Sequence, residues 1–338
     1  MRVAVVGAGR IGRLHAENLV RHFPQVEVVA VADVVRAAAE RCARALGIRR
    51  ALTDPAALFA DSEVDAVLIC SSTDTHADYI AAAADGGKHV FCEKPLALDL
   101  GEIDRALAAV ERSGVVLQVG FNRRFDPNFA AARRQVAAGE IGAPHLLRIT
   151  SRDPAPPPLD YVRVSGGIFL DMTIHDFDMA RFLLGDEVVE VYAAGSVLVD
   201  PQIREVGDVD TAAVTLRFAS GAIGVIDNSR RAAYGYDQRA EVFGERGMVR
   251  VENPKPHTAA LSVADGDRMP PLLPFFLERY AESYLRELSA FLETVRTGGA
   301  PPVTGRDGRL AVVIGYAAGR SLKEGRPVAL SEVDPTGG

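Results

Sequence analysis

Short apolar runs alternate with longer amphipathic stretches over the first 120 residues of the chain. The runs are rich in β-branched side chains and predict strands at residues 3–6, 26–32, 66–70, 89–91 and 115–119. Between the last two runs, Asp99 and Glu102 have the spacing of a capping box and Gly114 supplies a stop, so we expect a helix there. Because strands that alternate with helices build right-handed βαβ units, this half predicts a parallel sheet with helices on its faces.

After residue 120 the hydrophobic pattern changes to period two. Residues 211–218 alternate apolar and polar side chains, which predicts an antiparallel strand with one buried face. The Ser220-Gly221 turn leads into a further short run, and hairpins of an open sheet are therefore expected. Apolar positions at helical spacing in residues 285–295 and 310–317 predict two helices that cover one face of this sheet.

Composition supports a globular chain of two domains, which we place at residues 1–120 and 121–338. Hydrophobic residues make up 48% and charged residues 25%, which excludes a disordered or coiled-coil chain. The formal net charge is −7 without a basic block, and this argues against nucleic acid or an anionic membrane surface as a partner.

Cysteine use and hydropathy bear on the location of the protein. Cys42, Cys70 and Cys92 are odd in number and lack metal-ligand spacing, so we expect reduced, buried thiols with no disulfide and no structural zinc. The N-terminal apolar run is broken at Gly7, too early for a signal peptide, and no stretch approaches the roughly 20 apolar residues of a membrane span. We therefore expect a cytoplasmic protein without a membrane partner.

A glycine motif follows the first predicted strand and opens a helix. Gly7, Gly9 and Gly12, with Arg10 and Ile11 between them, form the G-x-G-x-x-G pattern. Such glycines allow a tight turn, close approach of a pyrophosphate and close packing of helix on strand, and the helix N-terminus attracts the anion. The motif alone is weak, but its position after a strand predicts a dinucleotide site.

The second predicted strand ends at Asp33, where an acidic residue belongs in a dinucleotide-binding unit. Its carboxylate can accept hydrogen bonds from both ribose hydroxyls and would repel a 2′-phosphate, so NAD is favoured over NADP. Arg36 and Arg10 lie near enough in sequence to soften this preference. A methyltransferase can share the glycines and the acid, and remains an alternative interpretation.

Two further segments follow predicted strands at the carboxyl edge of the sheet, where ligands of open α/β sheets bind. Residues 71–76 include Ser71, Thr73 and His76, which could line the cofactor, or alternatively form a polar loop in which Asp74 caps the next helix. In the second segment, Glu93-Lys94-Pro95, Lys94 could hold an alcohol or ketone oxygen and stabilise its negative charge during hydride transfer. The alternative for Lys94 is a solvated surface charge.

A candidate catalytic stripe lies in residues 165–181. If the segment is one helix, Asp171, His175 and Asp178 fall on one face, and a histidine between carboxylates suits general-base chemistry. The apolar residues that can anchor this helix in the core are Met172, Phe177 and Met179. A solvated helix surface is the alternative, whereas a metal triad would need a second histidine, so we predict no metal.

Polar groups in expected loops could reach a hydroxylated ligand: Asp153, Arg123, Arg124, Tyr234 and Tyr236. Ionised carboxylates accept hydrogen bonds from vicinal hydroxyls without a counter-charge. A site with several acids and few cations therefore favours a neutral polyol or sugar over an anionic substrate.

At these residues the chain resembles the Gfo/Idh/MocA oxidoreductase family, most of all its inositol 2-dehydrogenase branch. The Gly7 to Gly12 motif and Glu93-Lys94-Pro95 are shared widely in that family. The segments that look like the inositol branch are residues 120–127, 151–154, 165–185 and 234–239. The resemblance implies an α/β fold class, with an N-terminal Rossmann domain and a C-terminal α+β domain whose large, mostly antiparallel sheet often builds homotetramers.

The resemblance also implies roles for individual residues. The family's catalytic lysine falls on Lys94, and its aspartate and histidine fall on Asp171 and His175. In that interpretation His175 takes the hydroxyl proton, Asp171 orients it and assists the transfer, and Lys94 binds the reacting oxygen. The remaining ring hydroxyls would be held by Asp178, Asp153, Arg123 and Tyr234, while Asn122 would touch the cofactor.

The leading hypothesis is an NAD-dependent enzyme of inositol catabolism that oxidises myo-inositol to 2-keto-myo-inositol (scyllo-inosose). Three alternatives stay open: a dehydrogenase for another inositol isomer or a sugar, an NAD(P)-binding regulator without catalysis, and a methyltransferase. Which of Arg123 and Arg124 faces the ligand stays open as well.

Overall fold

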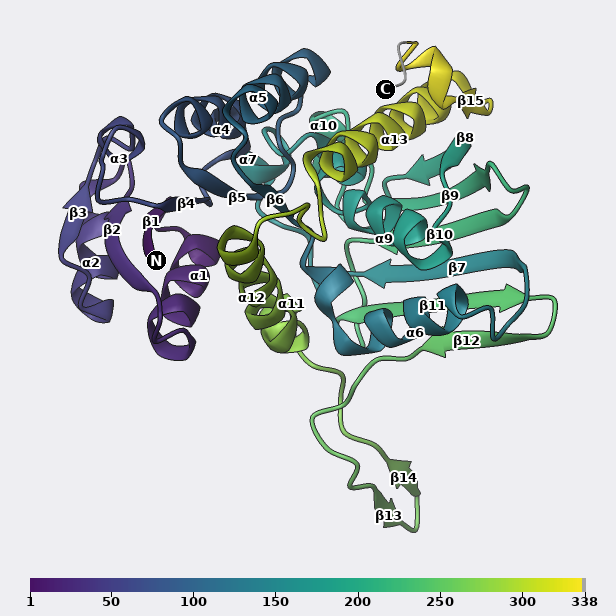
Figure 1. Ribbon diagram of the computed structural model, residues 1–338. Helices are drawn as coiled ribbons and strands as arrows, with labels where there is room; N and C mark the ends of the chain where they lie inside the picture. The colour runs from purple at the N-terminus through teal and green to yellow at the C-terminus, as the bar shows by residue number, and fades with distance from the viewer. Residues whose placement is uncertain (336–338) are drawn as a thin grey trace. The chain divides into compact units, whose positions relative to one another are not determined.

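The computed structural model describes residues 1–335, which form two compact units (Figure 1). The first unit comprises Met1–Asn122 and Glu282–Leu310. The second comprises Arg123–Ala281 and the chain from Ala311 onward. The first unit thus ends close to the boundary expected near residue 120, but it also includes Glu282–Leu310, which were expected in the second domain.

The first unit is built on a six-stranded sheet with the order β3-β2-β1-β4-β5-β6. Its strands are β1 (Arg2–Val6), β2 (Glu27–Ala32), β3 (Arg50–Leu52), β4 (Ala66–Ile69), β5 (His89–Glu93) and β6 (Leu117–Gly120). Every neighbouring pair is parallel, as predicted. The strand order reverses between β1 and β4, and a crevice for a ligand is expected at such a switch point. Strand β3 was not predicted from the sequence, because its three residues are only half-buried and form no apolar run.

Helices connect these parallel strands. They are α1 (Arg10–His22), α2 (Arg36–Leu46), α3 (Ala56–Phe59), α4 (His76–Asp85) and α5 (Leu100–Ser113). Helix α5 confirms the predicted N-terminus, because the Asp99 side chain accepts a hydrogen bond from the Glu102 amide. Gly114 ends it in the left-handed conformation that favours glycine.

Helix α12 (Ala281–Thr297) corrects one expectation of the sequence analysis. It was expected to cover the sheet of the second half, but its residues Leu288, Phe291 and Leu292 belong to the core cluster of the first unit. A helical apolar stripe shows that a face is buried, but it does not show which sheet buries it.

The second unit contains a seven-stranded sheet with the order β12-β11-β7-β10-β9-β8-β15. Its strands are β7 (Pro144–Arg152), β8 (Val188–Ser196), β9 (Thr211–Phe218), β10 (Ile223–Ser229), β11 (Asp237–Gly244), β12 (Gly247–Val251) and β15 (Val328–Ala329). Only the β7 and β10 pair is parallel among the described pairings of this sheet, so the mostly antiparallel sheet is confirmed. A separate hairpin joins β13 (Leu261–Val263) to β14 (Gly266–Arg268).

One face of this sheet carries the helices α6 (Pro127–Ala137), α9 (Ile174–Leu184) and α13 (Gly305–Glu324) (Figure 1). The second unit also contains the shorter helices α7 (Leu159–Val162), α8 (Gly167–Asp171), α10 (Gln202–Glu205) and α11 (Phe276–Arg279). Burial alternates along β9, as the period-two pattern predicted. Within residues 1–335, no helix has the length and apolar character that crossing a membrane requires.

Candidate active site

The three glycines of the G-x-G-x-x-G motif differ in what surrounds them. A Cβ atom on Gly7 would lie 2.4 Å from the Cys70 carbonyl oxygen, and one on Gly12 would clash with the Gly7 carbonyl oxygen at 2.0 Å. A Cβ atom on Gly9 would meet nothing within 4 Å. Gly7 and Gly12 are therefore required by packing, whereas Gly9 leaves open surface at the N-cap of α1, where a pyrophosphate can approach.

Asp33 is fixed beside this loop at the end of β2. Its Oδ2 accepts a hydrogen bond from the Ala8 amide (2.7 Å) and its Oδ1 accepts one from the Val35 amide (2.8 Å). Arg36 is exposed and lies 4.0 Å from Glu40. The carboxylate is thus held where a dinucleotide ribose is expected, which fits NAD.

The segment after β4 is tied to the lysine turn by His76. The ring of His76 is buried, with Nδ1 2.8 Å from the Pro95 carbonyl oxygen and Nε2 3.1 Å from the Ser71 carbonyl oxygen. Burial lowers the pKa of His76. The hydroxyls of Ser71 and Thr75 are 2.7 Å apart, and Thr73 begins a short 3₁₀ turn. His76 therefore holds the loop that was expected to line the cofactor.

Glu93 ends strand β5, and Lys94 follows it at the carboxyl edge of the sheet. Lys94 is half-buried and is joined to Pro95 by a cis peptide bond. The Glu93 side chain accepts a hydrogen bond from His15 Nε2 (2.8 Å), and Asn122, beyond β6, is buried with no hydrogen-bond partner for its Nδ2 among the described residues. An orphaned buried amide is the kind of group that a bound ligand satisfies.

The predicted catalytic stripe of the second unit is not one regular helix. Asp171 ends α8, and His175 is the second residue of α9. Between them, the Thr173 amide donates to the Ile168 carbonyl oxygen (2.8 Å) and the Thr173 hydroxyl donates to Asn228 Oδ1 (2.7 Å). These bonds lie at the interruption between α8 and α9, so residues 171–178 do not form the single continuous helix on which the predicted spacing depended. The three apolar anchors Met172, Phe177 and Met179 are buried, as expected.

Asp171 is held by two neighbours that the sequence analysis did not connect with it. Its Oδ1 accepts a hydrogen bond from the Tyr161 hydroxyl (2.8 Å), and its Oδ2 accepts one from Arg230 Nη1 (3.2 Å). Arg230 is 1% exposed. The Asp171 carboxylate is thus fixed in position by a hydrogen bond at each of its oxygens.

Arg123 and Arg124 both bind carboxylates of α9. Arg123 donates to Asp176 Oδ1 (2.7 Å), and Arg124 holds Asp178 through two nitrogens, at 2.9 and 2.6 Å. Asp176 was missed as a candidate, although it is buried and also accepts a hydrogen bond from Asn228 Nδ2 (2.8 Å). Burial raises the pKa of Asp176 despite Arg123.

Asp153 and Tyr234 lie in loops at the ends of strands. Asp153 follows β7 directly, and burial raises its pKa to about 6, although the charges of Arg123 and Arg230 oppose this rise. The Tyr234 side chain is 52% exposed; its hydroxyl donates to Asp237 Oδ2 (2.6 Å) and accepts from Arg152 Nη1 (2.9 Å).

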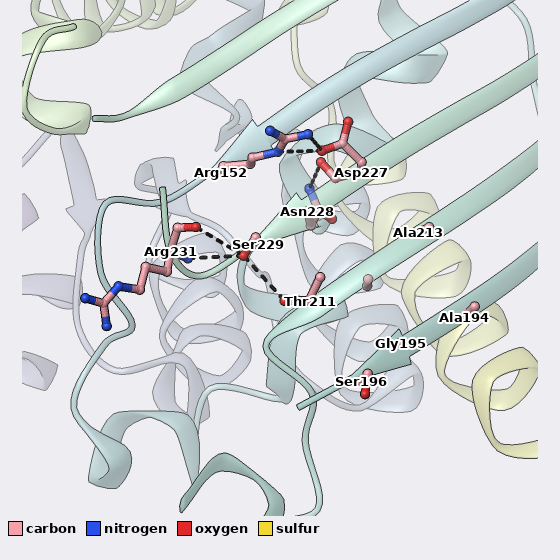
Figure 2. A pocket seen from close by; sticks show the side chains of 11 residues that line it. Arg152, Ala194, Gly195, Ser196, Thr211, Ala213, Asp227, Asn228, Ser229 and Arg231 are labelled. Atoms are coloured by element: carbon pink, nitrogen blue, oxygen red, sulfur yellow. Dashed lines mark hydrogen bonds and ion pairs between the residues drawn. The ribbon is translucent and has the colours of Figure 1, made fainter. Parts of the chain in front are cut away.

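A hollow of about 610 Å³ also lies in the second unit (Figure 2). The residues that line it include Arg152, Ala213, Asp227 and Ser229, at the ends of neighbouring strands. None of Asp153, Asp171, His175, Asp178 and Tyr234 lines it. Arg152, which lines the hollow, donates a hydrogen bond to Tyr234, so the hollow adjoins one of the predicted substrate residues without being lined by it.

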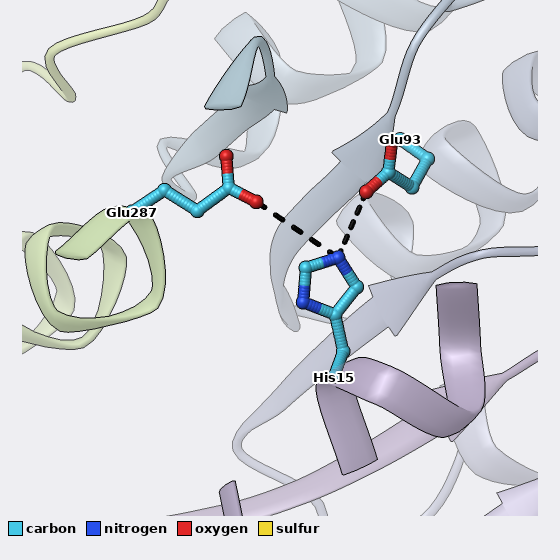
Figure 3. A group of neighbouring side chains, drawn as sticks. All are labelled: His15, Glu93 and Glu287. Carbon is cyan, nitrogen blue, oxygen red and sulfur yellow. Dashed lines mark hydrogen bonds and ion pairs between the residues drawn. The ribbon is translucent and has the colours of Figure 1, made fainter. Parts of the chain in front are cut away.

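Three side chains of metal-ligand type meet in the first unit (Figure 3). They are His15, Glu93 and Glu287, and their ligand atoms lie within 4.8 Å of one another. The sequence analysis named only Glu93. A polar residue on the buried stripe of a helix, as His15 is on α1 beside Gly12, Ala16 and Leu19, is the signal that could have found it.

Two protein-family domain models match successive parts of the chain. Residues 1–121 match the NAD-binding Rossmann-fold domain of the oxidoreductase family, and residues 129–250 match the GFO/IDH/MocA C-terminal domain. The chain is 56% identical to the myo-inositol 2-dehydrogenase of Thermotoga maritima over 98% of this chain and 99% of that protein. It is 42% identical to a scyllo-inositol 2-dehydrogenase (NAD(+)) of Bacillus subtilis over 98% of this chain and 96% of that protein.

Solved structures of dehydrogenases are also similar to this chain along nearly its whole length. The crystal structure of a probable dehydrogenase from Thermotoga maritima has a TM-score of 0.97 and 55% identity, and covers 98% of this chain and 100% of its own. A scyllo-inositol dehydrogenase from Lactobacillus casei, solved with bound NAD(H) and scyllo-inositol, has a TM-score of 0.92 and 29% identity, with 98% and 99% covered.

Fold, glycine loop and comparisons together define an NAD-dependent dehydrogenase acting on CH–OH groups. The matches to both domains, and the identity along nearly the whole chain, identify its family as well. The chain belongs to the Gfo/Idh/MocA oxidoreductases.

Proposed function

We propose that this dehydrogenase oxidises a secondary alcohol of a cyclic polyol, namely myo-inositol, to 2-keto-myo-inositol (scyllo-inosose). The observation that carries the proposal is the 56% identity, over 98% of the chain, to a myo-inositol 2-dehydrogenase. The acids of the second unit add support, because Asp153, Asp171 and Asp178 can accept hydrogen bonds from ring hydroxyls.

The catalytic roles are proposed for three residues. His175 takes the hydroxyl proton as general base, Asp171 orients it, and Lys94 binds the reacting oxygen through its ammonium group. Asp171 suits this role because Tyr161 and Arg230 hold its carboxylate in place. NAD, when bound, accepts the hydride.

The binding roles divide between the two units. For the cofactor we propose Gly7, Gly9, Arg10, Ile11, Gly12, Asp33, Ser71, Thr73, His76, Glu93, Lys94 and Asn122. For the substrate we propose Lys94, Arg123, Asp153, Asp171, His175, Asp178 and Tyr234. Residues 1–120, together with Asn122, would bind NAD, and residues 121–338 would build the oligomer and bind the substrate, to which Lys94 of the first unit would also contribute.

The test is NADH formation by purified protein with NAD and myo-inositol. Parallel reactions use scyllo-inositol and glucose, and each is repeated with NADP. Turnover on myo-inositol with NAD supports the proposal. Silence on myo-inositol together with turnover on another member of the panel contradicts the substrate.

A second candidate is a dehydrogenase for another inositol isomer or a sugar. It is favoured by the 42% identity to a scyllo-inositol 2-dehydrogenase, which shows that related chains act on more than one isomer. The ratio of kcat/KM for scyllo-inositol and myo-inositol decides between the two candidates.

His175→Ala separates either enzyme from a regulator that only binds NAD. An enzyme with His175 as general base loses kcat by about 100-fold or more while NAD binding is unchanged. Equal turnover in His175→Ala and in the unchanged chain would contradict the role of His175.

We propose a homotetramer located in the cytoplasm. Support for assembly comes from large apolar side chains that the strands of the second unit leave exposed: Tyr192, Ile223, Val225, Phe243 and Met248. Buried, free cysteines suit a reducing compartment. Sedimentation equilibrium tests the tetramer, and a monomer at micromolar concentration would contradict it.

A further inference from the structure

The turn that carries Lys94 is bounded on both sides by a buried histidine. On one side, Nε2 of His15, whose side chain is 0% exposed, lies 2.8 Å from Glu93 Oε1. On the other side, Nδ1 of His76 lies 2.8 Å from the Pro95 carbonyl oxygen. Since Lys94 lies between Glu93 and Pro95 in the chain, both of its neighbours are anchored.

The surroundings of His15 define its tautomer. Nδ1 has no hydrogen-bond partner among residues 1–335, so a proton there would be buried and unsatisfied. The proton therefore belongs on Nε2, from which the ring donates to Glu93 Oε1. Phe91 and Tyr284 hold the ring edge-on, with ring centroids 5.1 and 5.7 Å away. His15 is thus oriented by packing as well as by its hydrogen bond.

Glu287 of α12 completes the surroundings of this bond (Figure 3). Its side chain is 0% exposed, and its Oε1 lies 3.9 Å from His15 Nε2. Neither carboxyl oxygen has a hydrogen-bond partner in the described part of the chain, and burial together with the charge of Glu93 raises the pKa of Glu287 well above its usual value. At 3.9 Å, Glu287 Oε1 lies beyond hydrogen-bond length of His15 Nε2, so Glu93 is the partner of that nitrogen.

A metal ion is the other use that these three side chains suggest. A metal-bound histidine almost always donates its second ring nitrogen to a carboxylate, a carbonyl oxygen or water, and His15 Nδ1 has no such acceptor among the described residues. In addition, the 2.8 Å between His15 and Glu93 is an ordinary hydrogen-bond length. The arrangement fits a hydrogen bond better than a metal site.

We propose that His15 and His76 are positioning residues that clamp the Glu93-Lys94-Pro95 turn and thereby place the Lys94 ammonium group for catalysis. His15 belongs to α1, the helix that begins at the glycine loop, and His76 begins α4 beside Ser71. The clamp therefore ties the lysine turn to both segments proposed to bind NAD. This inference rests on the role proposed for Lys94.

The test replaces each histidine in two ways. His15→Leu removes the donor, whereas His15→Gln returns an amide N–H near the position of Nε2. His76→Leu and His76→Asn form the matching pair, because an asparagine amide lies near the position of Nδ1. The control is His22→Leu, since His22 is exposed at the end of the same helix as His15.

Three quantities are measured for every variant: kcat with its primary deuterium isotope effect, the Kd for NAD, and the rate at which acetic anhydride labels Lys94 in the absence of cofactor. We expect each leucine variant to lower kcat by about 10- to 100-fold and to enlarge the isotope effect. For His15→Leu the Kd for NAD should change less than about 3-fold, and in both leucine variants the rate of Lys94 labelling should change several-fold. In the His15→Gln and His76→Asn variants, kcat and the rate of Lys94 labelling should both return most of the way to the wild-type values.

A double-mutant comparison makes the test specific to Lys94. In a Lys94→Ala background, His15→Leu should lower the residual kcat by less than about 2-fold, because the lysine that it positions is gone. Equal losses with and without Lys94 would overturn the clamp. So would unchanged kcat and unchanged labelling in both leucine variants.

The labelling rate separates the clamp from the proposed substrate. If the wild-type protein turns over no inositol but His15→Leu still alters the rate of Lys94 labelling, the result supports the clamp and contradicts the proposed function. Binding of one Zn²⁺ or Mn²⁺ per chain that His15→Gln abolishes would replace the clamp by a metal site. Calorimetry with each metal alone measures this outcome.

Discussion

The glycines of the dinucleotide loop differ in what a side chain would meet there. Gly12→Ala would place its Cβ atom 2.0 Å from the Gly7 carbonyl oxygen, and the backbone must move. Gly9→Ala meets no protein atom within 4 Å, and its φ of −70° suits any residue.

We therefore expect the two substitutions to separate stability from cofactor binding. Gly12→Ala should lower the free energy of unfolding by about 1 to 3 kcal/mol through overpacking. Gly9→Ala should keep the Tm and weaken NAD binding by about 10-fold or more. Thermal melts and NAD titrations measure both effects, and a Gly9→Ala variant that binds NAD normally would contradict the position assigned to the pyrophosphate.

Glu287 predicts a pH-dependent stability. Its pKa in the folded chain is well above the usual 4.5, so the unfolded chain loses this proton at lower pH than the folded chain does. The folded chain therefore loses little stability through this proton near pH 4.5, and its free energy of unfolding falls further as the pH rises toward the pKa of Glu287 in the folded chain. Glu287→Gln removes this cost, and we expect it to raise the Tm at pH 8 by more than at pH 5.

The matched control for that experiment is Glu282→Gln on the same helix. Glu282 is exposed and pairs with Arg286, so its replacement should change the Tm little at either pH. A Glu287→Gln variant with the same Tm gain at pH 5 and pH 8 would show that Glu287 does not titrate differently on folding.

Among the elements, helix α9 is attached by two ion pairs that lie side by side in sequence. Arg123 binds Asp176 and Arg124 binds Asp178, and the side chains of Arg124 and Asp178 are 10% and 1% exposed. These pairs join the turn after β6 to the segment that carries His175. The local positions of the catalytic candidates therefore depend on arginines that precede the helix by about 50 residues.

Removing one partner of such an ion pair should lower the free energy of unfolding by more than removing both partners. Arg124→Met leaves the Asp178 carboxylate buried without its guanidinium and should lower the free energy of unfolding by about 3 to 5 kcal/mol. Arg124→Met combined with Asp178→Leu should lower it by less. Urea denaturation of the two variants decides, and a double variant less stable than Arg124→Met would contradict the expectation.

At the scale of the whole molecule, α12 makes the first unit discontinuous in sequence. Leu288, Phe291 and Leu292 lie in one core cluster with residues of β1, β2, β4 and β5. A fragment that ends at residue 122 lacks these side chains, and its core would be exposed to water.

We expect the fragment 1–122 to be largely unfolded and unable to bind NAD. Joining residues 281–310 to it through a long Gly/Ser linker should restore folding. The control carries Leu288→Ser and Phe291→Ser in the joined segment. Circular dichroism melts and NAD titration measure the outcome, and a cooperative melt of 1–122 alone would contradict the role of α12.

Much of the first unit could be predicted because its signals are local. Each of these signals depends on residues that are close neighbours in sequence: the apolar runs of β1 and β2, the glycine loop and the Asp99 cap. The family resemblance rested on the same kind of contiguous motif, and the comparisons confirm it. Alternation along β9 likewise needed no distant partner.

The parts that could not be predicted depend on partners far apart in sequence. Periodicity marked the apolar face of α12 but not the core that buries it. At the break between α8 and α9, the Thr173 hydroxyl donates to Asn228, 55 residues away. The pairing of His15 with Glu93 joins residues 78 apart. Local sequence restricts the backbone and decides which faces avoid water, whereas a buried polar group takes as its partner whichever side chain the folded chain brings within hydrogen-bond distance.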